Sequence, residues 1–429
     1  MPIALVVSSH CKKKGNGISK LNRHYMNQSF NRQQLYKFCK QGEFVEHGLT
    51  SIELSDKLEI TNNAIIQDEF NFEITKVKEY YLTHDISNKL VLRKLNDNLK
   101  RLYKDEQANR RIIISQVKTL LDESCPFWVL KTDIKNFYES INREKLISKF
   151  KDDSMLSYQS MYLLNKVFDN PTLLSATGVP RGMNISSTLS EIYMRKFDKW
   201  IRRFKGVYYS ARFVDDIIIF TNSLQSSLDL IANINPTLEL FAEGLVINDL
   251  KTELFNGTTL KAHCKITGIP IRNSNSLEYL GYRFTKEKRA KINCLKVSIA
   301  EKKVRKIKTR IILALVDFVK YKNFKLLENR IKFLTGNYSI RKNSEGNDLR
   351  AGIYYNYLQV TDLKVFDELN RFYRKALFSK SHSFGNKLSV SLSPLQKDKL
   401  NKYCFKTGFN LKVYNSFSFE EMTAIISCW

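Results

Sequence analysis

Two adjacent acidic residues inside an apolar hairpin pattern constrain this chain more than any other feature. Asp215 and Asp216 lie between the apolar runs at residues 207–209 and 217–220. Two carboxylates at the tip of an apolar hairpin cost free energy unless a positive charge offsets them. A bound divalent cation would supply that charge. An ordinary turn is the alternative, because Asp is common in turns for its own backbone hydrogen bonds.

A third acid ends a separate strand pattern. Residues 128–134 are apolar and β-branched and deliver Asp133, and a polar helix start follows near Asn142. Brought beside the hairpin acids, Asp133 would complete a cluster of three carboxylates. Hard oxygen donors of this kind hold two Mg²⁺ ions about 3.5–4 Å apart in phosphoryl-transfer sites. The sequence therefore predicts a divalent-metal site, provided that the three acids meet in space.

A glycine-bounded loop, residues 178–187, lies between these acids and leads into a helical pattern that runs to about residue 204. Gly178 and Gly182 allow close approach of backbone to a ligand, and we expect Ser186 or Ser187 to cap the helix. Alone this is a weak signal, because loop-to-helix junctions often contain Gly, Pro and Ser. Its position between the two acid motifs strengthens it.

Together, these segments resemble the ordered motifs of reverse transcriptases over residues 100–285. The matching residues are Asp133 with Phe137-Tyr138, Gly178-x-Pro180-Arg181-Gly182-x-x-x-Ser186, Phe213-x-Asp215-Asp216, Gly244-Leu245-x-x-Asn248-x-x-Lys251-Thr252 and Leu277-Glu278-Tyr279-Leu280-Gly281-Tyr282. Within the superfamily the chain is similar to the bacterial branch of retron, group II intron and phage-defence enzymes.

The resemblance implies an α+β right-hand polymerase with fingers, an antiparallel palm sheet and a helical thumb. By similarity, Asp133, Asp215 and Asp216 hold two Mg²⁺ ions, with Mn²⁺ as a substitute, and the carbonyl of Ile134 completes the coordination. The implied reaction is in-line attack of a primer 3′-hydroxyl on the α-phosphate of a dNTP. Lys251 matches a lysine thought to protonate the pyrophosphate. The alternative interpretation is an ordinary solvated lysine.

Other site residues follow from the same resemblance. Tyr138 matches an aromatic side chain beneath the sugar that excludes a 2′-hydroxyl, and it also suits core packing. The family places cations of the fingers on the triphosphate, and Arg110 or Arg111 is the expected choice here, with a solvated basic face as the alternative. The loop residues expected to contact dNTP or template are Pro180, Arg181, Gly182 and Ser186.

Two of the motif positions depart from the usual family pattern. Arg181 stands where retroviral and intron enzymes usually have Gln, and Phe213 where they have Tyr. A fixed guanidinium charge at position 181 favours contact with phosphate over base edges. How the template is held is therefore open.

The charge balance indicates a polyanionic partner. Lys and Arg total 70 against 43 acidic residues, a net charge of +27, which predicts salt-sensitive binding to nucleic acid. A membrane is the rival partner, and we expect none, because there is no run of about 18 apolar residues and no signal-peptide core. The seven cysteines form no Cys-x-x-Cys pair, so we expect reduced thiols in the bacterial cytoplasm and no zinc, even at His263-Cys264.

The length of 429 residues predicts several subdomains. We expect an N-terminal basic extension over residues 1–70 that contacts RNA or a partner, or is a disordered arm. After it we expect the fingers over residues 71–130 and the palm over 131–285, with part of the fingers inserted into the palm. A helical thumb over 286–345 and a helical C-terminal region over 346–429 complete the predicted order. An apolar stripe on the thumb helix leaves Lys302, Arg305 and Lys306 for duplex phosphates, or for solvent.

The tail has no His-Asn-His or paired-cysteine endonuclease pattern, and its tyrosine-rich helical character most resembles defence-associated reverse transcriptases. Three hypotheses follow. The first is an RNA-directed DNA polymerase in antiphage defence, templated by a noncoding RNA, with dNTPs as substrate, DNA as product and a second reverse transcriptase or another copy of itself as partner. The second is template-independent or protein-primed DNA synthesis. The third is an RNA-binding or splicing scaffold of the maturase type.

Overall fold

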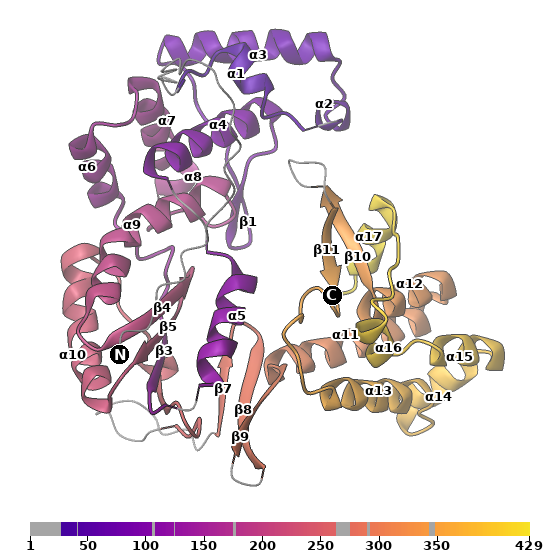
Figure 1. Cartoon of the computed structure of the whole chain (residues 1–429). Helices are drawn as coiled ribbons and strands as arrows, with labels where there is room; N and C mark the ends of the chain where they lie inside the picture. Colours follow the sequence, from indigo (N-terminus) through magenta and orange to yellow (C-terminus); the bar gives the residue numbers. More distant parts are fainter. Residues whose placement is uncertain are drawn as a thin grey trace, which may run out of the picture.

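The computed structural model describes residues 27–40, 42–104, 108–123, 125–174, 177–262, 275–289, 292–342 and 348–429. Figure 1 shows N-terminal helices at the top, a sheet-bearing region below them and C-terminal helices to one side. Helices and antiparallel sheets share the chain, which confirms the predicted α+β fold of a right-hand polymerase. No helix in the part of the chain described is long and apolar enough to cross a membrane.

The palm sheet has β3 (Trp128–Asp133) near its centre. All its strands are antiparallel, in the order β4–β5–β3–β6, with β4 (Val207–Phe213), β5 (Asp216–Thr221) and β6 (Glu253–Asn256). The register pairs Trp128 with Thr221 at one end and Asp133 with Asp216 at the other. The strand and the hairpin therefore form where the apolar patterns predict them.

Both faces of this sheet are covered. Side chains alternate along a strand, so Leu130 joins one hydrophobic core and Val129 the other. Helices α9 (Asn184–Arg203) and α10 (Leu224–Phe241) contact the sheet on the Leu130 side. Side chains on the Val129 side share a core with α5 (Arg110–Leu121) and a second antiparallel sheet, which consists of β7 (Ser276–Tyr279), β8 (Tyr282–Arg289) and β9 (Ile292–Ile299).

The segments predicted as fingers are helical and carry one hairpin, β1 (Thr75–Val77) with β2 (Tyr80–Leu82). Residues 27–70 pack into the same hydrophobic core as α4, although the sequence suggested a separate extension. Residues 1–26 lie outside the described part, so the predicted RNA contact there stays a prediction. The helices are α1 (Arg32–Tyr36), α2 (Glu43–Glu46), α3 (Ser51–Ile66), α4 (Ile86–Tyr103), α6 (Arg143–Asp153), α7 (Tyr158–Phe168) and α8 (Pro171–Leu174).

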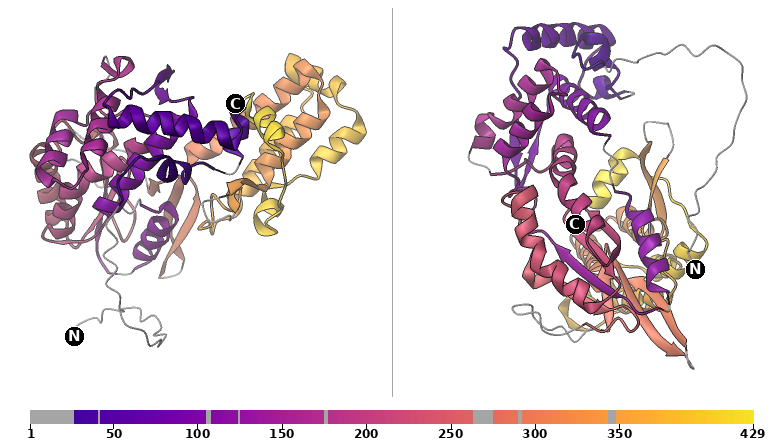
Figure 2. Two further views of the ribbon diagram at one scale, coloured as in Figure 1. Left: turned by 90° about the horizontal axis from the view of Figure 1, so that it is seen from above. Right: turned by 60° about the vertical axis from the view of Figure 1, so that its left-hand side comes forward.

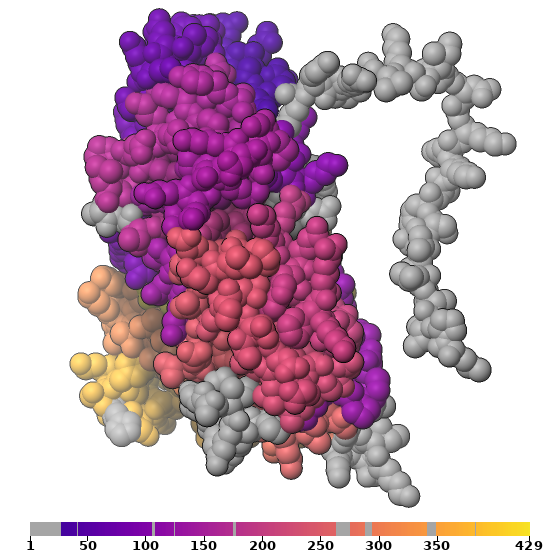
Figure 3. Space-filling view, turned by 90° about the vertical axis from the view of Figure 1, so that its left-hand side faces the viewer, coloured from indigo at the N-terminus to yellow at the C-terminus, as the bar shows by residue number. Residues whose placement is uncertain are grey.

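The C-terminal region is mostly helical and lies beside the palm and fingers in both views of Figure 2. Between its helices the region carries a hairpin of β10 (Asn337–Lys342) and β11 (Asp348–Gly352), although the sequence suggested helix throughout. Figure 3 shows the indigo-to-purple fingers and the magenta-to-red palm as one continuous surface on the opposite side. The helices are α11 (Glu301–Tyr321), α12 (Phe324–Thr335), α13 (Lys364–Leu377), α14 (His382–Ser391), α15 (Pro394–Asn401), α16 (Phe405–Asn410) and α17 (Phe419–Ile426).

The loop before α9 packs directly on the backbone that follows β3. The Val179 amide donates to the Tyr138 carbonyl over 2.7 Å. Gly178 has φ +69°, and a Cβ atom there would lie 2.1 Å from the same carbonyl oxygen. Only glycine therefore fits at position 178, for backbone conformation and for space.

The predicted serine cap of α9 is wrong. The helix begins at Asn184, and its N-cap residue Met183 makes no side-chain capping bond. The Ser186 hydroxyl instead donates to the Pro180 carbonyl, because the chain is already helical at that position and the hydroxyl folds back onto the loop.

A Gly178→Ala substitution tests this packing. We expect the free energy of unfolding to fall by about 2 kcal/mol or more, because the methyl group adds a backbone clash to the cost of about 1 kcal/mol for a left-handed residue. Gly48→Ala is the matched control, since Gly48 has the same φ of +69° and nothing lies within 4 Å of its Cβ position. Urea unfolding of both variants measures the difference, and equal losses would contradict close packing at Gly178.

Candidate active site

The three predicted acids converge at one end of the palm sheet. Asp133 and Asp216 are directly opposite each other in the β3–β5 register. The Ile134 amide donates to the Asp215 carbonyl over 3.2 Å, which makes Asp133 and Asp216 a non-hydrogen-bonded pair. Side chains of such pairs project from the same face and are the closest of any across two strands. The structure thus brings the acids from two distant motifs together.

Asp215 lies in the two-residue loop between β4 and β5, after Val214. Val214 has a φ of +61°, which is rare for a β-branched residue. Because Asp215 itself is not among the residues with positive φ, the loop has the pattern of a type II′ hairpin turn. Such a turn presents Asp215 beside Asp216 at the end of the sheet.

The acids carry more negative charge than the protein around them neutralises. Burial, then the charge of Asp215 and then that of Asp133 raise the pKa of Asp216 from 3.8 to about 6, although Lys131 and Lys251 lower it. Asp133 is only 4% exposed, and its Oδ1 atom is buried without a hydrogen-bond partner. An unpartnered buried carboxylate oxygen is costly, so this site suits a cation.

Lys251 lies within the acid site, as the resemblance implies. It ends the 3₁₀ turn η1 (Asp249–Lys251), and its ammonium contacts the Asp133 carboxylate. This hydrogen bond is the main reason why the pKa of Lys251 is raised. The side chain is still 60% exposed, so the lysine reaches Asp133 from the solvent side.

A divalent metal fits the chemistry of these residues. Among the residues that the structure describes, no three acidic, His or Cys side chains already form a metal cage, and the Lys251 ammonium contacts one oxygen of Asp133. The Ile134 amide faces the acid turn, and its carbonyl shares that side of the strand, while the neighbouring Asp133 carbonyl accepts from Asn248 over 2.7 Å. The carbonyl of Ile134, which is the predicted ligand, therefore faces away from the hydrogen bond that joins Asp133 to Asn248. His263-Cys264 lies outside the described residues.

A cleft of about 510 Å³ contains most of the residues expected to bind dNTP or template. Tyr138, Arg181, Gly182 and Ser186 all line it. The Arg181 guanidinium forms an ion pair with Glu139 and lies over the Tyr138 ring, 5.9 Å from its centroid. Pro180 lines an adjoining cleft of about 550 Å³, to which Arg181 also contributes.

Both clefts also contain residues that the sequence interpretation did not select. Tyr80, Asn96 and Lys100 line the first, and Lys76 and Lys78 of the β1–β2 hairpin line the second. The Tyr81 amide of this hairpin donates to the Arg181 carbonyl over 2.7 Å, which holds the hairpin against the loop. The alternating lysines of residues 76–78 were the available signal, but they precede the motifs that anchor the resemblance.

Arg110 lies elsewhere than predicted. Its guanidinium donates to the Leu280 carbonyl, at 2.6 and 3.0 Å, and stacks on Tyr282, 5.1 Å from the ring centroid. It is thus occupied at the β7–β8 turn and does not line either cleft. Arg111 is exposed and lines neither cleft. Both residues start α5, which shares a hydrophobic core with the Val129 side of the palm sheet.

The expected duplex-binding cations lie at the start of α11. Lys302, Arg305 and Lys306 are exposed, and Arg305 forms an ion pair with Glu301 at 3.1 Å. Burial first, then the charges of Lys306, Arg110 and Lys302, lower the pKa of Lys303 between them. The sequence interpretation did not select Lys303, and it placed Arg110 in a different group. The structure makes them parts of one positive cluster beside the β7–β8 turn.

Comparison with known proteins gives a family match over part of the chain. Residues 83–284 match the family described as reverse transcriptase (RNA-dependent DNA polymerase). A search of curated proteins by sequence finds no significant match. Among solved structures the chain is similar to telomerases of two Candida species, at low overall scores.

Apo telomerase from Candida tropicalis, truncated from its C-terminal domain, has 16% identity and a TM-score of 0.33 over 61% of this chain and 51% of that chain. Telomerase from Candida albicans in complex with a TWJ fragment of telomeric RNA has 14% identity and a TM-score of 0.35 over 79% of this chain and 53% of that chain. The corresponding Candida tropicalis complex has 15% identity and a TM-score of 0.34 over 91% and 57%. The chain thus spans between 51% and 57% of the length of these telomerases.

The family match covers both acid motifs, the glycine-bounded loop and Lys251 in the order expected of such enzymes. Residues 83–284 are thus similar to the reverse transcriptase (RNA-dependent DNA polymerase) family.

Proposed function

We propose that the whole protein is an RNA-directed DNA polymerase that adds dNTPs to a 3′-hydroxyl by two-metal phosphoryl transfer. The observation that carries this proposal is the close Asp133–Asp216 pair beside Asp215, within a reverse transcriptase domain. Three carboxylates at one end of a sheet, next to a cleft with cations and an aromatic ring, suit a triphosphate substrate with metal ions.

Asp133, Asp215, Asp216 and the carbonyl of Ile134 would hold the ions. The buried Asp133 Oδ1 atom has no hydrogen-bond partner, and burial together with the charges of Asp215 and Asp133 raises the pKa of Asp216; both observations support this assignment. Two Mg²⁺ ions, or Mn²⁺ in their place, would stabilise charge on the attacking and leaving oxygens. The carboxylates of the protein fix where those oxygens lie.

The remaining side chains would orient the nucleotide and its template. Tyr138 would lie under the sugar and disfavour a 2′-hydroxyl, and Arg181, with Pro180, Gly182 and Ser186, would contact dNTP or template. Lys100 and Lys76 line the clefts around these residues, and we propose them in place of Arg110 and Arg111 as cations for the triphosphate. Lysine is protonated at neutral pH and Asp133 raises the pKa of Lys251 further, so Lys251 carries the proton that a donor to pyrophosphate requires.

The duplex would lie along α11. Lys302, Arg305 and Lys306 are exposed at its start, and Lys303 and Arg110 belong to the same positive cluster. A cluster of this kind contacts phosphates without regard to sequence, and its binding weakens as salt rises. The net charge of +27 supports RNA and DNA as the partners of the protein.

We further propose that the protein acts in the bacterial cytoplasm in antiphage defence, with a noncoding RNA as template and a second reverse transcriptase or another copy as partner. The resemblance of the motif series and the tail to defence enzymes supports this proposal. Plaque counts on cells that express the protein with its flanking RNA are expected to fall, and Asp133→Ala should restore them. Protection that survives Asp133→Ala would favour the scaffold of the maturase type.

Primer extension tests the polymerase. With an RNA template, a DNA primer, dNTPs and Mg²⁺, we expect extension whose product is complementary to the template. Asp215→Asn with Asp216→Asn should reduce the rate by at least about 100-fold, because charge stabilisation in the transition state is lost. Tyr138→Ala should raise incorporation of rNTPs relative to dNTPs in the same assay.

Asp249→Asn is the matched control, since Asp249 is an exposed acid that lies 3.9 Å from Lys135 at the edge of the site. It should leave extension unchanged. DNA that is unrelated in sequence to any template or co-purified RNA would overturn templated synthesis and favour template-independent or protein-primed synthesis. Sequencing of the RNA that co-purifies with the protein tests the noncoding template.

The pKa of Asp216 predicts a pH dependence of stability in metal-free protein. In the folded state Asp216 keeps its proton up to about pH 6, whereas its ordinary pKa is 3.8. The folded state therefore binds more protons than the unfolded state in this window, and this group's contribution to stability falls as pH rises from 4 to 7. Because metal binding requires the ionised carboxylate, Mg²⁺ should stabilise the protein more at pH 7.5 than at pH 5.

Urea unfolding of the wild type and Asp216→Asn, with and without Mg²⁺, measures both effects. Asn does not titrate, so the difference between the two proteins isolates Asp216. Parallel pH profiles for the two proteins would show that the carboxyl group ionises normally in the folded state.

A further inference from the structure

We propose that Arg212 is a positioning residue for the catalytic turn: with Glu191 and Asp198 it forms a buried clamp that holds the Val214 carbonyl and thereby aims Asp215 and Asp216. The inference rests on the proposed function, since it concerns how the metal-binding carboxylates are placed. Arg212 itself touches neither substrate nor metal, because it lies on the other side of the sheet.

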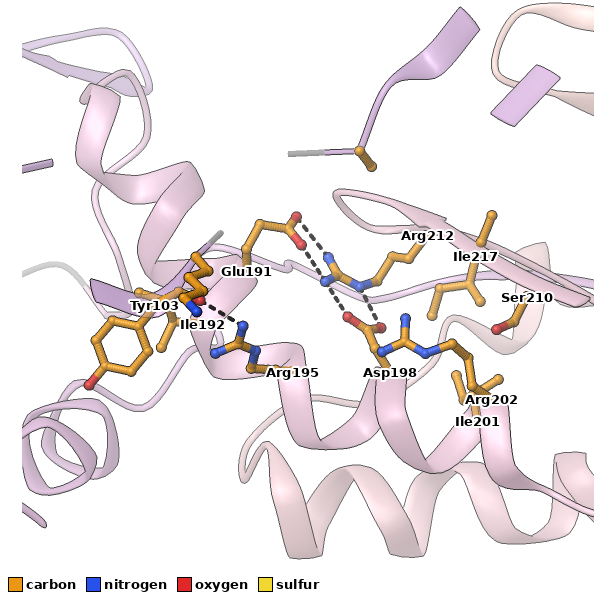
Figure 4. Close-up of a pocket in the computed structure, with 13 residues that line it drawn as sticks. Tyr103, Glu191, Ile192, Arg195, Asp198, Ile201, Arg202, Ser210, Arg212 and Ile217 are labelled. Carbon is orange, nitrogen blue, oxygen red and sulfur yellow. Dashed lines mark hydrogen bonds and ion pairs between the residues drawn. The ribbon is translucent and has the colours of Figure 1, made fainter. Parts of the chain in front are cut away.

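The clamp uses every hydrogen-bond donor of the arginine. Its Nε and Nη2 atoms donate to Asp198 over 2.9 and 2.6 Å, and its Nη1 and Nη2 atoms donate to Glu191 over 3.0 and 2.6 Å. A guanidinium has five N–H groups, and the fifth donates from Nη1 to the Val214 carbonyl over 2.8 Å. The side chain is only 5% exposed. Figure 4 shows the guanidinium between the two carboxylates.

The two acids come from a single helix. Glu191 and Asp198 are seven residues apart on α9, so they lie on one face, two turns apart. Two bidentate pairs fix the guanidinium plane, because each pair sets two of its N–H directions. The direction of the N–H group that remains, toward Val214, is therefore set by α9 and not by the turn.

Val214 is the residue in the turn that most needs such support. Its φ of +61° is strained for an ordinary residue, and more so for a β-branched one. The Val214 carbonyl belongs to the planar peptide unit that leads into Asp215. Holding this carbonyl fixes that peptide plane, and the Ile134 amide holds the next carbonyl, that of Asp215, at 3.2 Å.

The sheet register places the clamp behind the acids. Phe213 pairs with Asp216, whereas Arg212 pairs with Ile217, so Arg212 projects from the opposite face of the sheet toward α9. α9 also begins directly after the Arg181–Gly182 loop that lines the cleft. One helix thus positions both the cleft loop and the catalytic turn.

An Arg212→Lys variant tests the clamp, with Mn²⁺ binding followed by electron paramagnetic resonance in the absence of nucleotide. We expect the dissociation constant of the Mn²⁺ that Asp215→Asn abolishes to rise tenfold or more, because lysine keeps the charge but cannot hold two carboxylates and a carbonyl in one plane. Binding of an RNA–DNA duplex should not change. Unchanged Mn²⁺ affinity in a folded variant would overturn the proposal.

Arg195→Lys is the matched control. Arg195 lies on the same helix and lines the same cavity, of about 250 Å³, but it donates to the Tyr103 carbonyl over 2.6 Å. The same substitution there should leave Mn²⁺ affinity unchanged. An equal loss in both variants would indicate general damage to the cavity and overturn the specific role of Arg212.

A double-mutant cycle with Val214→Gly gives a readout that a merely structural role would not move. Glycine adopts positive φ without strain. The factor by which Arg212→Lys raises the dissociation constant of Mn²⁺ should therefore be at least threefold smaller in the Val214→Gly background than in the wild type. Additive effects would overturn the link between clamp and turn.

If Arg212→Lys does not fold, the variant Arg212→Met with Glu191→Gln and Asp198→Asn removes all three charges together and leaves none buried and unpaired. It should show the same loss of Mn²⁺ affinity, and wild-type affinity in this variant would overturn the clamp. Failure of the proposed function is distinguishable. A wild type that binds Mn²⁺ at the acids but extends no primer contradicts the polymerase and leaves the clamp in place.

Discussion

The pairing of β3 with β5 is the constraint on which the active site depends. A shift of one residue would turn Asp133 to the other face of the sheet, into the place of Thr132. That place is fully buried, and the Thr132 hydroxyl there bonds the Thr252 hydroxyl at 2.7 Å. A carboxylate in this position would lose its hydration without gaining a charged partner. The packing on the far face therefore fixes the register that brings Asp133 opposite Asp216.

Nearby lysines offset part of the charge of the three acids. The Lys251 ammonium contacts the Asp133 carboxylate directly. Lys131, which forms an ion pair with Glu253 at 2.9 Å, lowers the pKa of Asp216 through its charge. Under the proposed function Lys251 has two tasks that exclude each other, because an ammonium bound to Asp133 is not at a leaving group. Its exposed side chain gives it the reach to change partners.

Local sequence patterns predicted the parts of the site that depend on local structure. The apolar run before Asp133, the hairpin around Asp215 and the helical spacing before Phe204 each formed at the expected place. The roles of Arg110 and of the serines in the first turn of α9 did not follow from such patterns. Arg110 is set by the carbonyl of Leu280, far along the chain, and Ser186 by the fold of its own loop. Propensity describes a segment, whereas these contacts arise only when segments meet.

Arg212 shows why the sequence alone did not reveal the network that it forms with Glu191 and Asp198. An arginine next to the acid hairpin resembles a solvated strand edge, and Glu191 and Asp198 resemble the polar face of an amphipathic helix. Each interpretation changes once α9 packs on β4, because burial turns three ordinary surface charges into one network of five hydrogen bonds. The spacing of seven residues between the two acids carried the signal, but it became meaningful only with a buried cation between them. The strained turn that bears Asp215 and Asp216 is thus held from the opposite side of the sheet.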